Sequence, residues 1–140
     1  MRAQHAQNIE YRKYLALTKF FQAYDAPAPY YISDYLSAAR KHNLDYRLLP
    51  VISLLESGAG KHTCGDGIRR WGYGNCKGYV FATVPEGIEY ISAALENSEY
   101  YRGKSLEAKL KQYNPENPHY PAIVMGLMAE IQHSPASPEH

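Results

Sequence analysis

The chain concentrates its glycines in one stretch. Seven of the ten glycines lie between Gly58 and Gly78, whereas the residues just before them, Leu48 to Leu55, form an almost unbroken apolar run. Glycine disfavours the interior of helices and strands but permits tight turns. We therefore expect a buried helix that ends where the glycines begin and continues as a long irregular loop or a short hairpin.

Glu56 stands at the junction between this apolar run and the glycines. Apolar surroundings penalise the charged form of a carboxyl group, and the negative end of a helix disfavours an anion. Both effects raise the pKa, which is what a proton donor working near neutral pH requires. The alternative interpretation is a glutamate held in an ion pair with Lys61 or Arg69 at a helix end.

The remaining pattern is helical and predicts an all-α single domain of five to six helices. Asp45 is placed to cap the Leu48 helix, and Thr83 and Glu86 have the spacing of a capping box. Because that cap already explains Glu86, we do not favour it as a second catalytic carboxylate. Apolar spacing and turn residues predict the other helices over 8–24, 31–42, 84–101, 106–113 and from Pro121 onward.

The predicted organisation is a peripheral N-terminal helix over 1–24, the main body over 25–132 and a flexible tail over 133–140. The formal net charge is +1, with acidic and basic residues interspersed, so no nucleic-acid surface is expected. No apolar run reaches the length of a membrane-spanning helix. No signal peptide is visible, so export would need a leader that has been removed or another route. We expect a monomer without metal or cofactor.

The two cysteines, Cys64 and Cys76, lie twelve positions apart in the glycine-rich stretch. The interpretation we favour is a disulfide that staples this loop, which implies an oxidising compartment. Two free thiols are the main alternative. A zinc site that recruits His62 is a weaker one, because the candidate ligands lack regular spacing.

Tyr113 and Asn114 form a further candidate element. They close a predicted helix and precede a proline-rich turn, so they could face a cleft. The alternative is that Asn114 only starts the turn ahead of Pro115.

Four motifs in this order resemble the lysozyme-like superfamily, and especially bacterial soluble-lytic-transglycosylase and glucosaminidase-type domains. They are Asp45-Tyr-Arg-Leu-Leu-Pro-Val-Ile, Glu56-Ser-Gly-Ala-Gly-Lys, Trp71-Gly-Tyr-Gly-Asn and Pro85-Glu-Gly-Ile. The resemblance continues through Tyr113-Asn114 and covers roughly residues 25 to 132. It implies a lysozyme-like fold and cleavage of peptidoglycan glycan strands, in the periplasm or outside the cell.

By this resemblance Glu56 matches the catalytic acid, and the substrate contacts come from three motifs: Ser57, Gly72, Tyr73, Asn75, Tyr113 and Asn114. Asp66, in the glycine-rich stretch, is the best candidate for a second carboxylate. The chain has Gly-Tyr-Gly-Asn where the transglycosylases have Gly-Leu-Met-Gln, and Pro115 follows Asn114 directly. Transglycosylase, muramidase and glucosaminidase chemistry therefore all stay open, and a non-catalytic glycan-binding domain of an envelope assembly is the alternative from another class.

Overall fold

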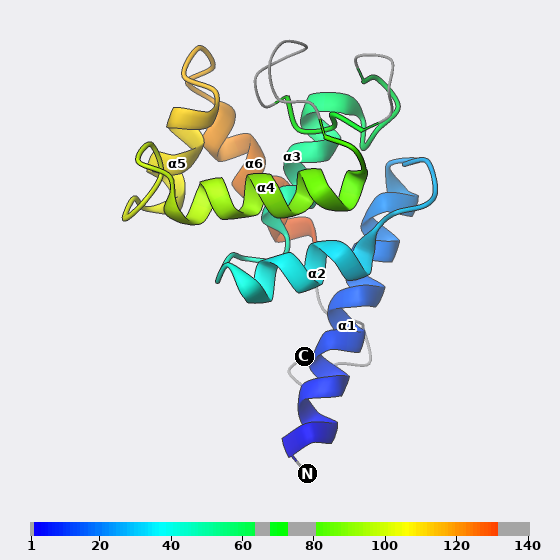
Figure 1. The fold of residues 1–140 in the computed structure, drawn as a ribbon. Coiled ribbons are helices and arrows are strands. Elements are labelled where there is room, and N and C mark those ends of the chain that lie inside the picture. Colours follow the sequence, from blue (N-terminus) through cyan, green and yellow to red (C-terminus); the bar gives the residue numbers. More distant parts are fainter. Residues whose placement is uncertain (1, 64–67, 73–80, 132–140) are drawn as a thin grey trace.

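The computed structural model describes residues 2–63, 68–72 and 81–131, where the regular elements are six α-helices and no strands (Figure 1). The all-α prediction is confirmed. The helices are α1 (Arg2–Ala23), α2 (Ile32–Lys41), α3 (Leu48–Ser57), α4 (Val84–Asn97), α5 (Leu106–Tyr113) and α6 (Tyr120–Glu130). Most of the glycine-rich stretch lies outside the described residues, so the choice between a loop and a hairpin stays a prediction.

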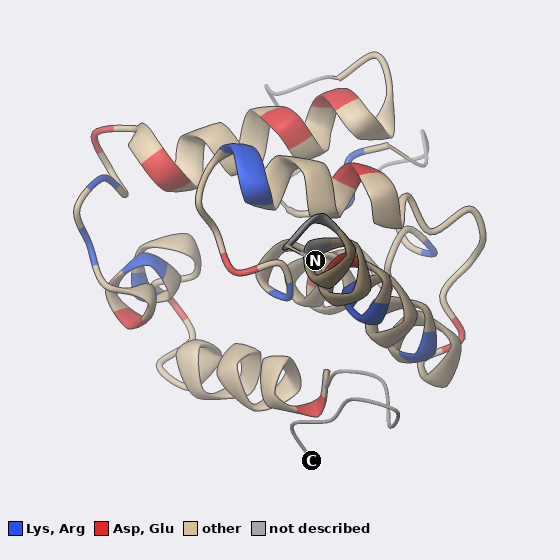
Figure 2. Ribbon diagram, turned by 90° about the horizontal axis from the view of Figure 1, so that it is seen from below, with Lys and Arg blue, Asp and Glu red and all other residues tan. Residues whose placement is uncertain are grey.

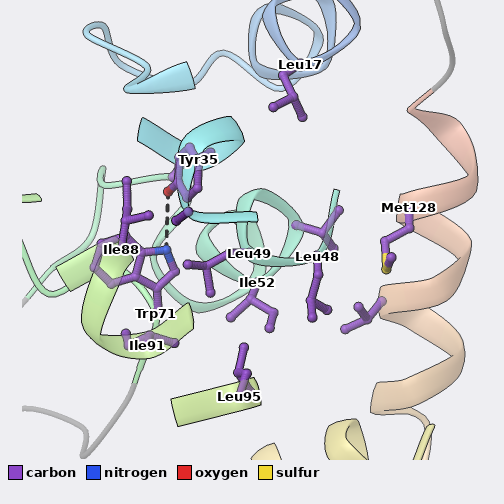
Figure 3. Packing of buried hydrophobic residues seen from close by; sticks show 14 of the residues in the cluster. Leu17, Tyr35, Leu48, Leu49, Ile52, Trp71, Ile88, Ile91, Leu95 and Met128 are labelled. Atoms are coloured by element: carbon purple, nitrogen blue, oxygen red, sulfur yellow. Dashed lines mark hydrogen bonds between the residues drawn. The ribbon is translucent and has the colours of Figure 1, made fainter. Parts of the chain in front are cut away.

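The core is built around α3. Most of this helix is buried, which agrees with its nearly continuous apolar sequence, and it packs against α6. On the other side α2 packs against α4, and the ring of Trp71 is buried next to Tyr35 of α2 and Ile88 of α4 (Figure 3). Helices α5 and α6 pack together and complete the domain.

Helix α1 joins the core through its C-terminal half alone. Its buried side chains are Ala16, Leu17, Phe20 and Phe21, and they lie against α2. The N-terminal half projects away from the other helices (Figure 1), and the helix begins at Arg2, six residues before the predicted start. The hydrophobic core thus includes part of the segment 1–24.

Asp45 does not cap α3, and that prediction was wrong. Its Oδ1 accepts a hydrogen bond from the backbone N–H of Arg47 at 3.0 Å, and its two oxygens accept from the Arg47 guanidinium at 2.9 and 2.8 Å. The residue at the N-cap position is Arg47, whose side chain makes no capping bond. Asp45 lies two residues before the N-cap, so its carboxylate reaches the N–H of Arg47 and not an N–H of the first helical turn.

Helix α4 starts as predicted and ends early. The Thr83 hydroxyl accepts from the N–H of Glu86 at 3.2 Å, and the Glu86 carboxylate accepts from the N–H of Ala82 at 3.3 Å. The helix was expected to reach Tyr101, but it stops at Asn97 because Ser98 adopts an extended conformation with ψ 159°. Tyr101 is nevertheless buried, held by a separate turn after the helix.

Charge is mixed over the surface. In Figure 2 basic and acidic residues are both spread over the molecule, although α4 carries acidic residues alone. Among the described residues, no helix combines the length and apolarity that crossing a membrane would demand.

Candidate active site

Glu56 lies in the last turn of α3, half-buried. The helix stops there because Gly58 and Ala59 both adopt left-handed backbone conformations, with φ of 60° and 58°. Their N–H groups donate to the carbonyls of Leu54 and Ser53, both at 2.9 Å, and so satisfy the helix end. The glycine predicted to end the helix therefore does so, and the Glu56 carboxyl group lies beside the turn that follows.

The hydroxyl of Tyr120 donates to Oε2 of Glu56 at 2.9 Å. Tyr120 is the first residue of α6, is buried, and stacks on the ring of Tyr113 with centroids 6.3 Å apart and planes 2° from parallel. Since buried tyrosine rings bring their hydroxyl to a partner, the α5–α6 pair positions one oxygen of the α3 carboxyl group.

Gly72 lies against the other carboxyl oxygen. A Cβ atom added at this position would stand 2.5 Å from Oε1 and 3.1 Å from Cδ of Glu56. Its φ of 67° is also in the left-handed region that favours glycine. Any side chain at position 72 would thus displace the carboxyl group or the loop.

The segment 70–72 is held in place by side chains from three helices. The Ser57 hydroxyl lies 2.7 Å from the carbonyl of Arg70, and the Tyr113 hydroxyl donates to the carbonyl of Trp71 at 2.5 Å. The indole N–H of Trp71 donates to the Tyr35 hydroxyl at 3.2 Å. Helices α3, α5 and α2 therefore fix the backbone that passes beside Glu56.

The electrostatic environment raises the pKa of Glu56. Burial disfavours its charged form, and the hydrogen bond from Tyr120 lowers the pKa by a smaller amount. No cation of the described chain adds to these effects, and the Lys61 ammonium lies 3.5 Å from the carbonyl of Tyr24 instead. The Glu56 carboxyl group therefore holds its proton more tightly than an exposed glutamate does.

The residues predicted for the site fall into three groups. Glu56 and Gly72 are in contact, and the Tyr113 hydroxyl bonds to the carbonyl of Trp71, the residue before Gly72. Ser57 is 3% exposed and its hydroxyl bonds to backbone groups, while Asn114 is the half-buried C-cap residue of α5. The others lie outside the described residues: Cys64, Asp66, Tyr73, Asn75 and Cys76.

Tyr120 is the site residue that sequence reasoning missed. The sequence signal was its place directly before Pro121, the residue predicted to open the last helix. A tyrosine in the first turn of a helix has a fixed direction, but which distant group it meets depends on the packing of α6 against α3.

Comparisons of the chain with models of protein families, with curated proteins and with solved structures found no match.

Proposed function

We propose that this chain cleaves the glycan strands of peptidoglycan, with Glu56 as the single general acid/base. The observation that carries the proposal is a half-buried carboxyl group at a helix end, with a raised pKa and one oxygen held by Tyr120. The resemblance to lysozyme-like domains gives further support, because its Glu56, Trp71-Gly72 and Tyr113 motifs converge on this one spot.

We infer different tasks for the two carboxyl oxygens. Because Oε2 accepts from Tyr120, the acidic proton would reside on Oε1, on the side of Gly72. Glu56 would pass this proton to the glycosidic oxygen as the bond to the anomeric carbon breaks. The acetamido oxygen of the substrate would stabilise the positive charge that develops on that carbon.

The second step determines the product. The ionised Glu56 would remove a proton either from the 6-hydroxyl of the same sugar or from water. The first route gives an anhydro-sugar by transglycosylation, and the second gives a reducing end by hydrolysis. A two-carboxylate mechanism would instead need Asp66 within about 5 to 9.5 Å of Glu56.

The proposed substrate has consequences for location. Peptidoglycan lies outside the cytoplasmic membrane, so the protein would act in the periplasm or outside the cell. A Cys64–Cys76 disulfide would suit that oxidising environment, and a thiol titration of the denatured protein that found two free thiols would contradict it.

A glycan-binding domain without catalytic activity is the alternative. Incubation of the wild-type protein with purified sacculi distinguishes the two functions. We expect soluble fragments whose mass spectra show anhydro or reducing sugar ends. Co-sedimentation with sacculi that releases no fragments would overturn the catalytic proposal and support the binding one.

A further inference from the structure

His42 joins α2 to α4 through both of its ring nitrogens. It is the buried C-cap residue of α2, with Nδ1 2.9 Å from a carboxylate oxygen of Glu96 and Nε2 2.6 Å from one of Glu89. Both carboxylates belong to α4 and remain 41% and 45% exposed. The contact thus combines a buried imidazole with two solvated acids.

This arrangement requires a protonated imidazole. Neutral histidine has one N–H donor and one acceptor nitrogen, so it can satisfy one carboxylate only, whereas imidazolium donates to both. Burial acts to lower the pKa of His42, but the hydrogen bonds and charges of Glu96 and Glu89 outweigh burial and raise it above the ordinary 6.5. The same contact lowers the pKa of Glu89.

Helices α2 and α4 also enclose Trp71. From α2, the Tyr35 hydroxyl accepts the indole N–H. From α4, Gly87 approaches the indole so closely that an added Cβ would stand 2.6 Å from Cζ3 of Trp71. The separation of the two helices therefore sets the width of the slot that holds Trp71, the residue next to Gly72.

We propose that His42 is a pH-dependent clamp across α2 and α4, which keeps the Trp71 slot closed and thereby holds Gly72 against Glu56. The effect on activity rests on the function proposed for Glu56, whereas the effect on Trp71 does not. A loosened slot would shift the backbone at Gly72 away from the Oε1 atom it now touches.

The pH range of the clamp follows from the two pKa directions. A raised histidine pKa stabilises the fold fully below the unfolded value of 6.5, and this contribution is lost as pH rises through the raised value. A lowered glutamate pKa stabilises above the unfolded value of 4.5 and is lost as pH falls below it. Both His42 contacts are therefore fully formed between pH 4.5 and pH 6.5, and the clamp opens at alkaline pH.

Neighbouring charges limit how far it opens. The Lys41 ammonium lies 3.2 Å from the same Glu89 oxygen that contacts His42, so this ion pair survives when His42 becomes neutral. Arg40 is directed away from the clamp, toward Glu10 of α1. Loss of the proton should hence loosen the α2–α4 contact without unfolding the domain.

Trp71 is the only tryptophan of the chain, so its fluorescence reports on the slot alone. The experiment records Trp71 emission and the melting temperature from pH 5 to pH 9 for the wild type, His42→Gln and His42→Arg. Between pH 6.5 and pH 9 the wild type should show a red shift of emission and a fall of about 3 °C in melting temperature. The His42→Gln variant should resemble alkaline wild type throughout, and His42→Arg should keep the low-pH emission to pH 9.

His119→Gln is the matched control, because His119 is an exposed histidine at the N-cap of α6 and should leave the wild-type transition unchanged. An emission that is constant over pH 5 to 9 in the wild type would overturn the proposal. So would a transition that persists in His42→Gln or in His42→Arg; if His42→Gln failed to fold, His42→Arg alone would decide. None of these outcomes depends on glycan cleavage.

Discussion

The hydroxyl of Tyr120 lies 2.9 Å from Oε2 of Glu56, although 64 positions separate the two residues. This contact joins the first turn of α6 to the last turn of α3. It holds the carboxyl group in a half-buried position, where burial raises its pKa and the tyrosine counteracts part of that rise. The proposed acid is thus positioned by a residue that none of the recognised motifs contains.

Tyr120→Phe should change the pH dependence of cleavage. The variant keeps the stacking on Tyr113 but removes the bond that lowers the Glu56 pKa, so that pKa should rise further. Since the acid must be protonated, the alkaline limb of the pH–rate profile should move to higher pH. We expect kcat to fall roughly tenfold, equivalent to about 1.4 kcal/mol, because the carboxyl group is less well oriented.

Tyr100→Phe is the control for that variant, since Tyr100 is 57% exposed in the turn after α4. It should alter neither the limb nor the rate. An alkaline limb that stays in place in Tyr120→Phe would contradict the assigned role of Tyr120.

Gly72→Ala should impair both stability and activity. Its Cβ would meet Oε1 of Glu56 at 2.5 Å, and the backbone has φ 67°. Gly103→Ala is a close control, because Gly103 has φ 75° but open space around it. Each should lose about 1 kcal/mol of unfolding free energy through backbone strain. Only Gly72→Ala should also lose cleavage activity, and equal activity in the two variants would argue against the contact with Glu56.

Gly87→Ala tests the Trp71 slot. The added methyl group would stand 2.6 Å from Cζ3 of Trp71 and 2.9 Å from the ring of Phe81, so overpacking should cost about 1–3 kcal/mol in denaturant unfolding. Gly126→Ala, in helix α6 with nothing within 4 Å, should instead stabilise by up to about 1 kcal/mol. A stable Gly87→Ala protein with unchanged Trp71 fluorescence would refute a tight slot.

The raised pKa of Glu56 predicts that this residue lowers the stability of the folded protein by an amount that depends on pH. The folded state disfavours the charged carboxylate. The loss of stability is therefore absent below pH 4.5, the pKa in the unfolded chain, and develops as pH rises through the raised pKa of the folded state. Glu56→Gln should therefore melt a few degrees above the wild type at pH 8, and this advantage should shrink at pH 4.5. A difference in melting temperature that is the same at both pH values would contradict the raised pKa.

Local features were predictable from the sequence. The glycines located the end of α3, α5 spans Leu106–Tyr113 as predicted, and the Thr83–Glu86 cap formed. Each of these depends on residues within about four positions of one another, where spacing and capping chemistry act directly. Glu56 at a helix end was recognisable for the same reason.

Features that depend on competition or on packing were not predictable. Asp45 stands two residues before the N-cap of α3 and pairs with Arg47 instead of capping the helix, and α4 ended at Asn97, where Ser98 becomes extended. The contact of Tyr120 with Glu56 requires α6 to pack against α3, which no short-range pattern encodes. The same limit applies to His42, whose partners lie on another helix.

The central claim is that Glu56 supplies the proton that breaks the glycan strand. Its most direct test is the rate at which soluble fragments leave purified sacculi, measured for equal amounts of folded wild type, Glu56→Gln and Glu99→Gln. Glu99 is an exposed glutamate in the turn after α4 and serves as the matched control. We expect a rate at least 100-fold lower for Glu56→Gln, as the loss of a general acid requires, and an unchanged rate for Glu99→Gln. Equal release by the wild type and Glu56→Gln would contradict the claim.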